Sequence, residues 1–471
     1  MLRGAGVRPV ASYEPDPLVR SATLDSRRVE PGDLFFALRG LEVDGVDFVP
    51  QAAERGASAI VAGVPRPSWL DPAIAWVEVD EARRAAALLS RELQGRPDLA
   101  LTLVGITGTN GKTTVSYLIE SIARAAGMRA GRIGTVGHAF GDVERGAIRT
   151  TPEAPEFYRL LAEMRDASTE LVAIEVSSHA LALDRVAGAR FQVAAFLNLG
   201  RDHLDFHQTA AAYFEAKARL FDALDESQWA VVPAGDPRGE QIRRRTTAHV
   251  LGFGREAGAD VRLRDEHCGV DGSRAVLDTP RGSVPIRTFL LGRFNLDNIA
   301  AAAACALSAG IGPDAIAAGA LALERVPGRV ERIDRGQPFA VVVDYAHTAD
   351  ALQNVLRFAT DVTAGRVHVV FGCGGERDRG KRAEMGRVAA ASGATIYITS
   401  DNPRGEDPER IIDEIEQGVL AVPGGAGRCT RLADRRAAIE AAILAAAADD
   451  AVVIAGKGHE TTQTVAGRVV T

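Results

Sequence analysis

The stretch Gly105-Ile106-Thr107-Gly108-Thr109-Asn110-Gly111-Lys112-Thr113-Thr114 decides the fold of this chain. It continues a buried-strand pattern, Leu99 to Gly105, into a glycine turn that opens a helix. Glycines let the backbone N–H groups of such a turn face a phosphate, aided by the N-terminus of the helix. In a phosphate loop the lysine reaches the β- and γ-phosphates, and the hydroxyl that follows it holds Mg²⁺.

This loop departs from the strict phosphate-loop spacing, because position 106 is Ile where the pattern requires Gly. The strand, the Gly-Lys-Thr-Thr run and the helix together still favour a nucleoside triphosphate site over a chance glycine-rich turn. The residues that we expect to bind the triphosphate are Gly108, Thr109, Asn110, Gly111, Lys112, Thr113 and Thr114.

Strand and helix patterns alternate outward from this loop, which predicts an α/β fold. At 471 residues the chain is long enough for about three domains. We place them at residues 1–98, 99–325 and 326–471, with a mostly parallel sheet in the central domain and a Rossmann-like C-terminal domain. Strands predicted at 339–343, 367–371, 394–399 and 451–455 each end in a polar or glycine-rich loop, where open α/β sheets bind ligands.

The composition is that of an ordinary globular protein, with 46% hydrophobic and 25% charged residues. The net charge of -7 and the lack of a basic block argue against a nucleic-acid partner. No run of about 18 apolar residues and no signal-like N-terminus occur, so we expect no membrane insertion. The four cysteines form no close pair, which favours a reducing, cytoplasmic location.

Lysine is rare in this chain. Of 55 basic residues only four are lysine, at positions 112, 217, 381 and 457, and all four lie in glycine-rich or polar motifs. A lysine retained under such a bias is a candidate for chemistry that a guanidinium cannot perform, although a compositional remnant on the surface is the alternative.

The run Gly-Thr-Asn-Gly-Lys-Thr resembles the loop of the Mur ligase and folylpolyglutamate synthetase superfamily, and the resemblance extends over nearly the whole chain. It implies an ATP-dependent ligase with Mg²⁺ as cofactor. ATP would phosphorylate a carboxylate to an acyl phosphate, an amine would attack it, and ADP and phosphate would leave. Magnesium and Lys112 would offset the charge on the transferred phosphoryl group.

The resemblance also assigns the metal and nucleotide residues. Catalytic roles fall to Lys112, Lys217, His203 and Arg329, and metal binding to Thr113, Glu175, His203 and Lys217, the last as a carbamate formed with CO₂. On the nucleotide side it points to Asn295, Asn298 and Asp344, with Asp344 at the ribose. The residue patterns alone leave other interpretations open: a helix cap for Glu175 or His203, an exposed lysine at 217, and a capping turn at the two asparagines.

A uridine-diphosphate-linked muramoyl dipeptide is the implied carboxylate substrate. The matching positions are Leu24, Ser26, Leu41, Glu42, Val43, Thr150, Thr151, Ser177 and Arg185. The threonine pair precedes Pro152 and is equally compatible with a capping turn.

The implied amine is meso-diaminopimelate, which differs from lysine by a second carboxylate and its stereocentre. A bidentate arginine reads such a group, and a buried arginine disfavours lysine because its charge would stay unpaired. The matching residues are Arg377, Asp401, Asn402, Pro403, Arg404, Gly456 and Glu460. An Asn-Pro turn is the structural alternative. Rival functions are a lysine-adding or folylpolyglutamate-type ligase, a Mur-like ligase of specialised metabolism, and a regulatory protein with a decayed nucleotide site.

Overall fold

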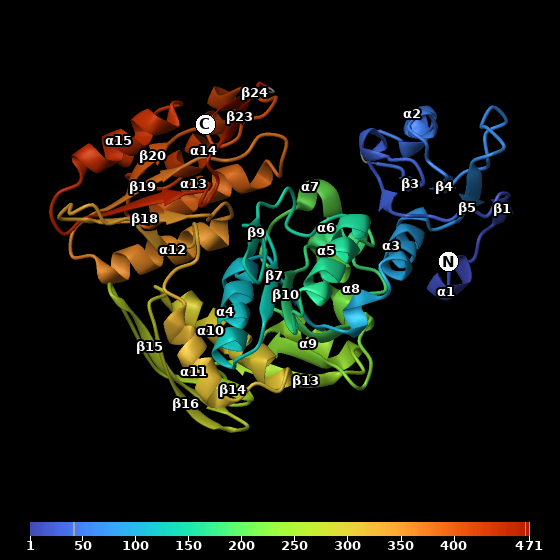
Figure 1. The fold of residues 1–471 in the computed structure, drawn as a ribbon. Coiled ribbons are helices and arrows are strands. Elements are labelled where there is room, and N and C mark those ends of the chain that lie inside the picture. The colour runs from blue at the N-terminus through green and yellow to red at the C-terminus, as the bar shows by residue number, and fades with distance from the viewer. Residues whose placement is uncertain (41–42, 467, 471) are drawn as a thin grey trace.

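The computed structural model describes residues 1–40, 43–466 and 468–470. Three domains follow one another along the chain, each built on its own large sheet. The N-terminal domain (blue) and the C-terminal domain (orange to red) lie on opposite sides of the central domain (Figure 1). Among the described residues, no helix has the length and apolar character needed to cross a membrane.

The N-terminal domain has a five-stranded sheet in the order β1-β5-β4-β3-β2, parallel except for β1. Alternate residues of β3 face opposite layers: Phe35 packs toward α2, whereas Leu34 and Phe36 pack toward α3. The elements are α1 (Leu2–Ala5), β1 (Ala11–Tyr13), β2 (Ala22–Thr23), β3 (Leu34–Ala37), α2 (Val49–Glu54), β4 (Ala59–Ala62), β5 (Ala75–Glu78) and α3 (Ala82–Leu93).

The central domain contains an eleven-stranded sheet in the order β16-β15-β14-β13-β12-β11-β6-β10-β7-β8-β9. Its strands are β6 (Thr102–Thr107), β7 (Ala130–Ile133), β8 (His138–Phe140), β9 (Val143–Arg145), β10 (Leu171–Glu175), β11 (Phe191–Phe196), β12 (Trp229–Pro233), β13 (His249–Gly254), β14 (Val261–Gly269), β15 (Gly272–Thr279) and β16 (Gly282–Thr288). Its helices are α4 (Lys112–Ala125), α5 (Ala154–Asp166), α6 (Ser178–Ala182), α7 (Leu204–His207), α8 (Ala210–Asp222), α9 (Pro237–Arg245), α10 (Arg293–Ser308) and α11 (Pro313–Ala322).

Helices cover both faces of this central sheet. The core that contains Val104 and Ile106 of β6 also holds α4, α10 and α11. Leu103 of the same strand lies in a second core with α5, α6, α8 and α9. Strands β14, β13, β12, β11, β6, β10 and β7 are parallel, whereas β15, β16, β8 and β9 add antiparallel edges that the sequence patterns did not predict.

The C-terminal domain has a six-stranded sheet in the order β17-β18-β22-β19-β20-β21, parallel except for β17. Helices α12, α13 and α14 pack on one face and α15 on the other. The elements are β17 (Glu331–Arg332), β18 (Ala340–Asp344), α12 (Ala349–Val362), β19 (Val367–Phe371), α13 (Gly380–Ala391), β20 (Thr395–Ile398), α14 (Pro408–Leu420), β21 (Cys429–Arg431), α15 (Arg435–Ala445), β22 (Ala451–Ala455), β23 (Gln463–Val465) and β24 (Arg468–Val470).

The connection between the first two domains is anchored by one buried carboxylate. Asp98, in the short 3-10 helix Pro97–Leu99, accepts two hydrogen bonds of 2.9 Å from the Arg91 guanidinium of α3. It also accepts the backbone N–H of Arg190 at 3.1 Å. Helix α3 packs against α5 of the central domain as well, so the N-terminal sheet is held beside the second core.

Candidate functional site

The predicted phosphate loop lies between β6 and α4, as its sequence indicated. Gly111 caps the helix with φ 90°, a left-handed conformation that favours glycine. Lys112 Nζ donates to the carbonyl oxygens of Gly108 (2.8 Å) and Thr109 (3.0 Å). Thr113 and Thr114 are buried in the first turn of the helix. Burial lowers the pKa of the Lys112 ammonium.

Register brings three strand ends together at this loop. In the sheet, β10 and β11 flank β6, with Glu175 paired to Ile106 and Phe196 to Thr107. The Asn198 side chain, just beyond β11, accepts the backbone N–H groups of Thr109 (3.1 Å) and Asn110 (2.9 Å). Asn198 therefore shapes the loop, and the sequence prediction gave it no role because its partners are distant in the chain.

Glu175 is fully buried at the end of β10 and forms no ion pair within the described part of the chain. Its carboxylate accepts the Thr113 hydroxyl at 3.1 Å and the N–H and hydroxyl of Thr135, each at 2.9 Å. A buried carboxylate is costly unless a cation compensates it. Carboxylate and hydroxyl oxygens are ligands that Mg²⁺ prefers, so these residues fit that cofactor. No cluster of three His, Cys, Asp or Glu side chains suited to a metal occurs among the described residues.

His203 lies at the N-terminus of α7 in a left-handed conformation, φ 54°. Its Nε2 is 3.3 Å from a carboxylate oxygen of Asp202, and its ring packs edge-on against that of His179, with centroids 4.8 Å apart. Burial lowers the pKa of His203 to about 3, so the imidazole is neutral near pH 7 and able to act as a ligand.

Lys217 is buried in α8 and is not the exposed lysine that its helix pattern also allowed. Its Nζ donates to the carbonyl oxygen of Gly108 at 2.8 Å and lies 4.4 Å from the centre of the Tyr213 ring. Burial, followed by the nearby Lys112, holds the pKa of Lys217 well below its usual value. The Lys217 side chain therefore contacts the phosphate loop at Gly108. Its lowered pKa means that the amine loses its proton more readily than that of an exposed lysine.

A cavity of about 400 Å³ opens beside the loop between the central and C-terminal domains. Of the residues predicted for nucleotide, metal or catalysis, the cavity is lined by Thr109, Asn110, Gly111, Lys112, Thr113, Thr114, Glu175, His203, Asn298, Arg329 and Asp344. Thr150, predicted for the precursor, lines it as well. Asn295 is buried behind Asn298 and accepts the Asn298 side-chain amide at 2.9 Å. Gly108 and Lys217 also lie outside the lining, with the Lys217 amine bonded to the Gly108 carbonyl.

Residues of the C-terminal domain form the other side of this cavity. Arg329 Nη2 donates to the Thr113 hydroxyl at 3.0 Å, and its guanidinium stacks over the Tyr345 ring at 4.5 Å. The Asp344 carboxylate accepts the backbone N–H groups of Val330 and Ala346, both at 2.7 Å. Its pKa is raised by burial. The contacts of Arg329 therefore join the loop to the third domain.

Asp202 is a second point of contact between these domains. Its carboxylate is 3.5 Å from His347 Nε2 and 3.6 Å from Lys381 Nζ, both in the C-terminal domain. Arg201 beside it pairs with Asp378 at 3.3 Å. The sequence prediction gave none of these residues a role, although Lys381 belonged to the conspicuous set of rare lysines.

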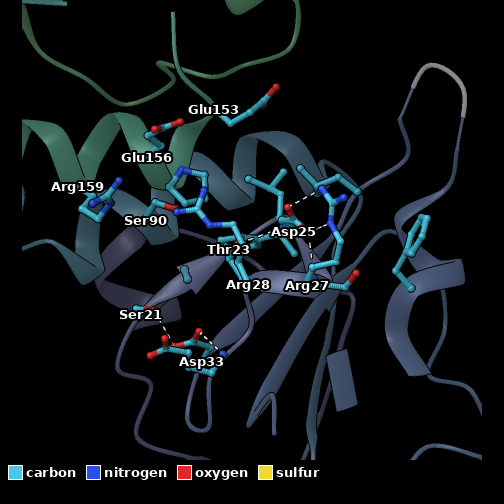
Figure 2. Close-up of a pocket in the computed structure, with 18 of the residues that line it drawn as sticks. Ser21, Thr23, Asp25, Arg27, Arg28, Asp33, Ser90, Glu153, Glu156 and Arg159 are labelled. Atoms are coloured by element: carbon cyan, nitrogen blue, oxygen red, sulfur yellow. Dashed lines mark hydrogen bonds and ion pairs between the residues drawn. The ribbon is translucent and has the colours of Figure 1, made fainter. Parts of the chain in front are cut away.

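A larger cavity of about 1280 Å³ lies between the N-terminal and central domains. Figure 2 shows Glu153, Glu156 and Arg159 of the central domain above Asp25 and Arg28 of the N-terminal domain. Six arginines line the cavity: Arg27, Arg28, Arg55, Arg83, Arg149 and Arg159. The sequence analysis assigned a role to none of them, because the chain has 51 arginines and the sequence does not show which of them lie close together in the fold. Five carboxylates line it too, Asp25, Glu30, Asp33, Glu153 and Glu156, and Arg27 is paired with Asp25 at 2.9 Å. A guanidinium binds a phosphate group through bidentate hydrogen bonds, so the other arginines of the cavity are candidates to hold a diphosphate.

The predicted precursor residues divide between several places. Leu24, Ser26 and Val43 line the larger cavity, whereas Leu41 and Glu42 lie outside the described residues. Thr151 donates its hydroxyl to the Glu175 carbonyl at 2.7 Å and accepts the Ser177 N–H at 3.0 Å. Arg185 donates to the Thr151 carbonyl at 3.2 Å and pairs with Glu153 at 2.8 Å. Thr151, Ser177 and Arg185 thus form a hydrogen-bonded group between the larger cavity and Glu175.

The residues predicted to read the amine converge at the C-terminal ends of β19, β20 and β22. Glu460 accepts the Asn402 amide at 2.9 Å and Lys457 Nζ at 2.8 Å. Gly456, at φ 110°, leaves room for Asp401, because a Cβ there would lie 2.7 Å from the Asp401 carboxylate. Pro403 is buried next to this group.

Two neighbouring arginines complete the predicted set: Arg404 is half-buried and lies within the electrostatic influence of Asp401 and Glu460, and Arg377 is exposed. Arg404 Nη1 donates to the Gly375 carbonyl at 2.6 Å, and Arg377 donates to the Glu376 carbonyl at 3.2 Å. Within the described chain, neither guanidinium forms an ion pair with a carboxylate. Burial and the neighbouring Arg377 lower the pKa of Arg404. Arg404, with Arg377 as its neighbour and Asp401 and Glu460 near enough to act on its charge, therefore brings positive and negative groups together at this end of the sheet.

Comparison with known proteins agrees with this geometry. Family models match residues 19–89 (Mur ligase family, catalytic domain), 106–306 (Mur ligase middle domain) and 328–458 (Mur ligase, glutamate ligase domain). The chain is 44% identical to the UDP-N-acetylmuramoyl-L-alanyl-D-glutamate–2,6-diaminopimelate ligase of Geobacillus kaustophilus, covering 97% of this chain and 93% of the relative. It is 42% identical to the enzyme of that name from Geobacter metallireducens, covering 94% and 89%.

Solved structures give the same result. One described as a UDP-N-acetylmuramoyl-L-alanyl-D-glutamate–2,6-diaminopimelate ligase superposes with a TM-score of 0.67 at 33% identity, covering 96% of this chain and 92% of that one. A folylpolyglutamate synthase of Mycobacterium tuberculosis, complexed with ADP and AMPPCP, shares the fold at a TM-score of 0.66 and 19% identity, covering 80% of this chain and 92% of that one. The chain therefore belongs to the Mur ligase family.

Proposed function

We propose that this protein is an ATP-dependent ligase that joins meso-diaminopimelate to UDP-N-acetylmuramoyl-L-alanyl-D-glutamate through an acyl phosphate. The observation that carries the proposal is the half-buried Arg404 guanidinium, which has Arg377 as a neighbour and lies within the electrostatic influence of Asp401 and Glu460. Relatives of 42–44% identity bear the name of this activity.

The larger cavity is the proposed place of the nucleotide-linked precursor. Leu24, Ser26 and Val43 would contact its uridine diphosphate end, where the arginines of the cavity supply positive charge. Thr150, Thr151, Ser177 and Arg185 would hold the dipeptide as it approaches Glu175. This arrangement would direct the acceptor carboxylate from the larger cavity toward the smaller one.

The smaller cavity is the proposed place of ATP. In the loop from Gly108 to Thr114, the backbone N–H groups of Gly111 to Thr114 would face the phosphates, because Asn198 already accepts those of Thr109 and Asn110. Lys112 would swing from its loop carbonyls to the γ-phosphate. Arg329 would approach the same phosphate from the C-terminal domain. The proposed nucleoside contacts are Asn295, Asn298 and Asp344, with Asn295 acting through Asn298.

Magnesium is the cofactor that we assign to the carboxylate end of this cavity, where it would offset charge on the transferring phosphoryl group. Thr113, Glu175 and His203 would hold it, together with Lys217 as a carbamate. To form the carbamate, the neutral Lys217 amine adds to the carbon of CO₂ and releases one proton. The low pKa imposed by burial favours that neutral amine.

The amine pocket is proposed at Arg377, Asp401, Asn402, Pro403, Arg404, Gly456 and Glu460. Arg404 would take the distal carboxylate of diaminopimelate in a bidentate contact, and Glu460 with Asp401 would take the distal ammonium. Lysine lacks that carboxylate, so it would leave Arg404 unpaired. As part of the same proposal, the domains span residues 1–98, 99–325 and 326–471, and the reaction takes place in the cytoplasm.

The test is amine-dependent phosphate release from ATP with the UDP-linked dipeptide and a panel of diamino acids. We expect release with meso-diaminopimelate at a kcat/KM at least tenfold above that of L-lysine, since a bidentate charged contact contributes about 2 kcal/mol or more. Equal rates with lysine and diaminopimelate would be compatible with a ligase but would refute diaminopimelate as its specific amine substrate. No release with any amine would refute both.

A further inference from the structure

The hairpin of β23 and β24 lies against the Asp401–Arg404 loop. The backbone N–H of Arg404 donates to the Thr464 carbonyl at 2.9 Å, and the N–H of Ala466 donates to the Arg404 carbonyl at 2.7 Å. Arg404 and Val465 thereby form an isolated parallel bridge. The hairpin thus adds a short backbone pairing to the loop that follows β20.

The backbone of Arg404 needs this support. Its φ is 54°, in the left-handed region that residues other than glycine adopt only where their surroundings impose it. The two backbone hydrogen bonds from the hairpin fix that conformation. They also set the direction in which the Arg404 side chain leaves the loop.

The hairpin orients Asn402 as well. The Thr464 N–H donates to Asn402 Oδ1 at 3.0 Å, and Asn402 Nδ2 donates to Glu460 Oε2 at 2.9 Å. A backbone N–H is only a donor and a carboxylate is only an acceptor, so the amide has a single orientation that satisfies both partners. Thr464 therefore determines that Asn402 presents its amide nitrogen to Glu460.

Gln463 is the side chain that ties the hairpin to the base of this loop. Its Nε2 donates to the Asp401 carbonyl at 2.6 Å and approaches the Ser400 carbonyl at 3.4 Å. Both partners are acceptors, which again fixes the amide orientation. Both hydrogen bonds of the Gln463 side chain go to backbone carbonyls of this loop, so its effect on the substrate would act through the loop.

We propose that Gln463 is a positioning residue for the amine substrate. Its amide and the backbone of β23 hold residues 401–404 in the one conformation in which Arg404 faces the distal carboxylate and Asn402 supports Glu460. This inference rests on the proposed function. It extends the amine pocket to the hairpin, which the sequence analysis gave no role.

The test uses Gln463→Ala, Gln463→Glu and, as a matched control, Gln417→Ala at an exposed position of α14. Two lost hydrogen bonds should raise the apparent KM for diaminopimelate about tenfold in Gln463→Ala. Gln463→Glu should be worse, because a carboxylate would face two carbonyl oxygens. The apparent KM values for ATP and the UDP-dipeptide should stay within about twofold, and the preference for diaminopimelate over lysine should fall.

The outcomes separate the two proposals. If the wild-type protein shows no diaminopimelate-dependent phosphate release, the proposed function and this inference fall together. If the wild type is active but Gln463→Ala keeps both its KM for diaminopimelate and its selectivity, the inference alone is wrong. Equal changes in all three KM values, with an unchanged ratio of diaminopimelate to lysine, would also overturn it, since that pattern belongs to general loosening of the domain.

Discussion

Replacing Arg404 by alanine tests the amine pocket at its most specific contact. In the structure the guanidinium is half-buried, donates to the Gly375 carbonyl at 2.6 Å, and has Arg377 as its charged neighbour. Alanine and arginine are both strained at φ 54°, so the exchange removes the side chain with little change in backbone preference. The variant should therefore fold like the wild type.

The magnitude follows from the type of contact. Truncating one partner of a buried, hydrogen-bonded charge pair costs about 2–5 kcal/mol. Because Arg404 is only half-buried, we take the lower end, about 2 kcal/mol, which corresponds to a loss of about thirtyfold in kcat/KM for diaminopimelate. Arg404→Lys should recover little of this, since a point-like ammonium cannot reproduce the planar fork.

The assay is the initial rate of phosphate release at saturating ATP and UDP-dipeptide, with diaminopimelate or lysine varied. The kcat/KM for lysine should stay the same or rise, because lysine makes no carboxylate contact with Arg404 and the variant removes the cation that lysine would leave unpaired. Apparent affinities for ATP and the dipeptide should also hold, since their proposed sites lie mainly in the other domains. If Arg404→Ala keeps the wild-type preference for diaminopimelate over lysine, the assignment of this arginine to the distal carboxylate is wrong.

Three further predictions concern other parts of the molecule. Lys217→Ala should lose most activity, and short carboxylic acids should restore part of it by replacing the carbamate; full activity without them would contradict carbamylation. Binding of ATP and precursor should reduce the radius of gyration in small-angle scattering, and Lys381→Met should lessen the change by removing the 3.6 Å contact with Asp202; an unchanged wild-type radius at saturation would contradict closure. The Arg382 guanidinium lowers the pKa of Glu406 in the folded protein to about 2. The ionised Glu406 therefore stabilises the folded state at pH values above its unfolded pKa of about 4.3, and this stabilisation is lost as the pH falls toward 2. Glu406→Gln should therefore lower Tm at pH 7 and approach the wild type as pH falls below about 4, whereas a constant difference in Tm would refute this origin.

Local patterns predicted the parallel parts of the fold well. Strands β19 and β22 begin and end at the predicted residues, because a strand buried on both faces of a parallel sheet is a mostly apolar run. The antiparallel strands β14 to β16 carry charged residues on an exposed face, for example Arg264 and Arg274. Their buried residues alternate with exposed polar ones, so they do not form the continuous apolar runs from which the parallel strands were predicted.

The site divides in the same way. The phosphate loop could be predicted from the sequence because its strand end, its glycine turn and the start of its helix are consecutive in the chain. Asn198 and Gln463 were not, since each acts on a loop that is at least 60 residues away. Neither residue is unusual in composition, so only the folded chain brings it next to its partners. The rare lysines gave a partial signal: Lys381 and Lys457 also proved to be buried and paired with carboxylates, Asp202 and Glu460.

The most direct test of the account is the identity and stoichiometry of the product. The protein would be incubated with ATP, Mg²⁺, UDP-N-acetylmuramoyl-L-alanyl-D-glutamate and equal amounts of meso-diaminopimelate and L-lysine. The nucleotide-linked products would then be identified and quantified by mass spectrometry. We predict one dominant product, the dipeptide precursor plus diaminopimelate minus one water, with one ADP and one phosphate formed for each new amide bond. ATP hydrolysis without a conjugate, or a lysine conjugate in equal or greater amount, would contradict the account.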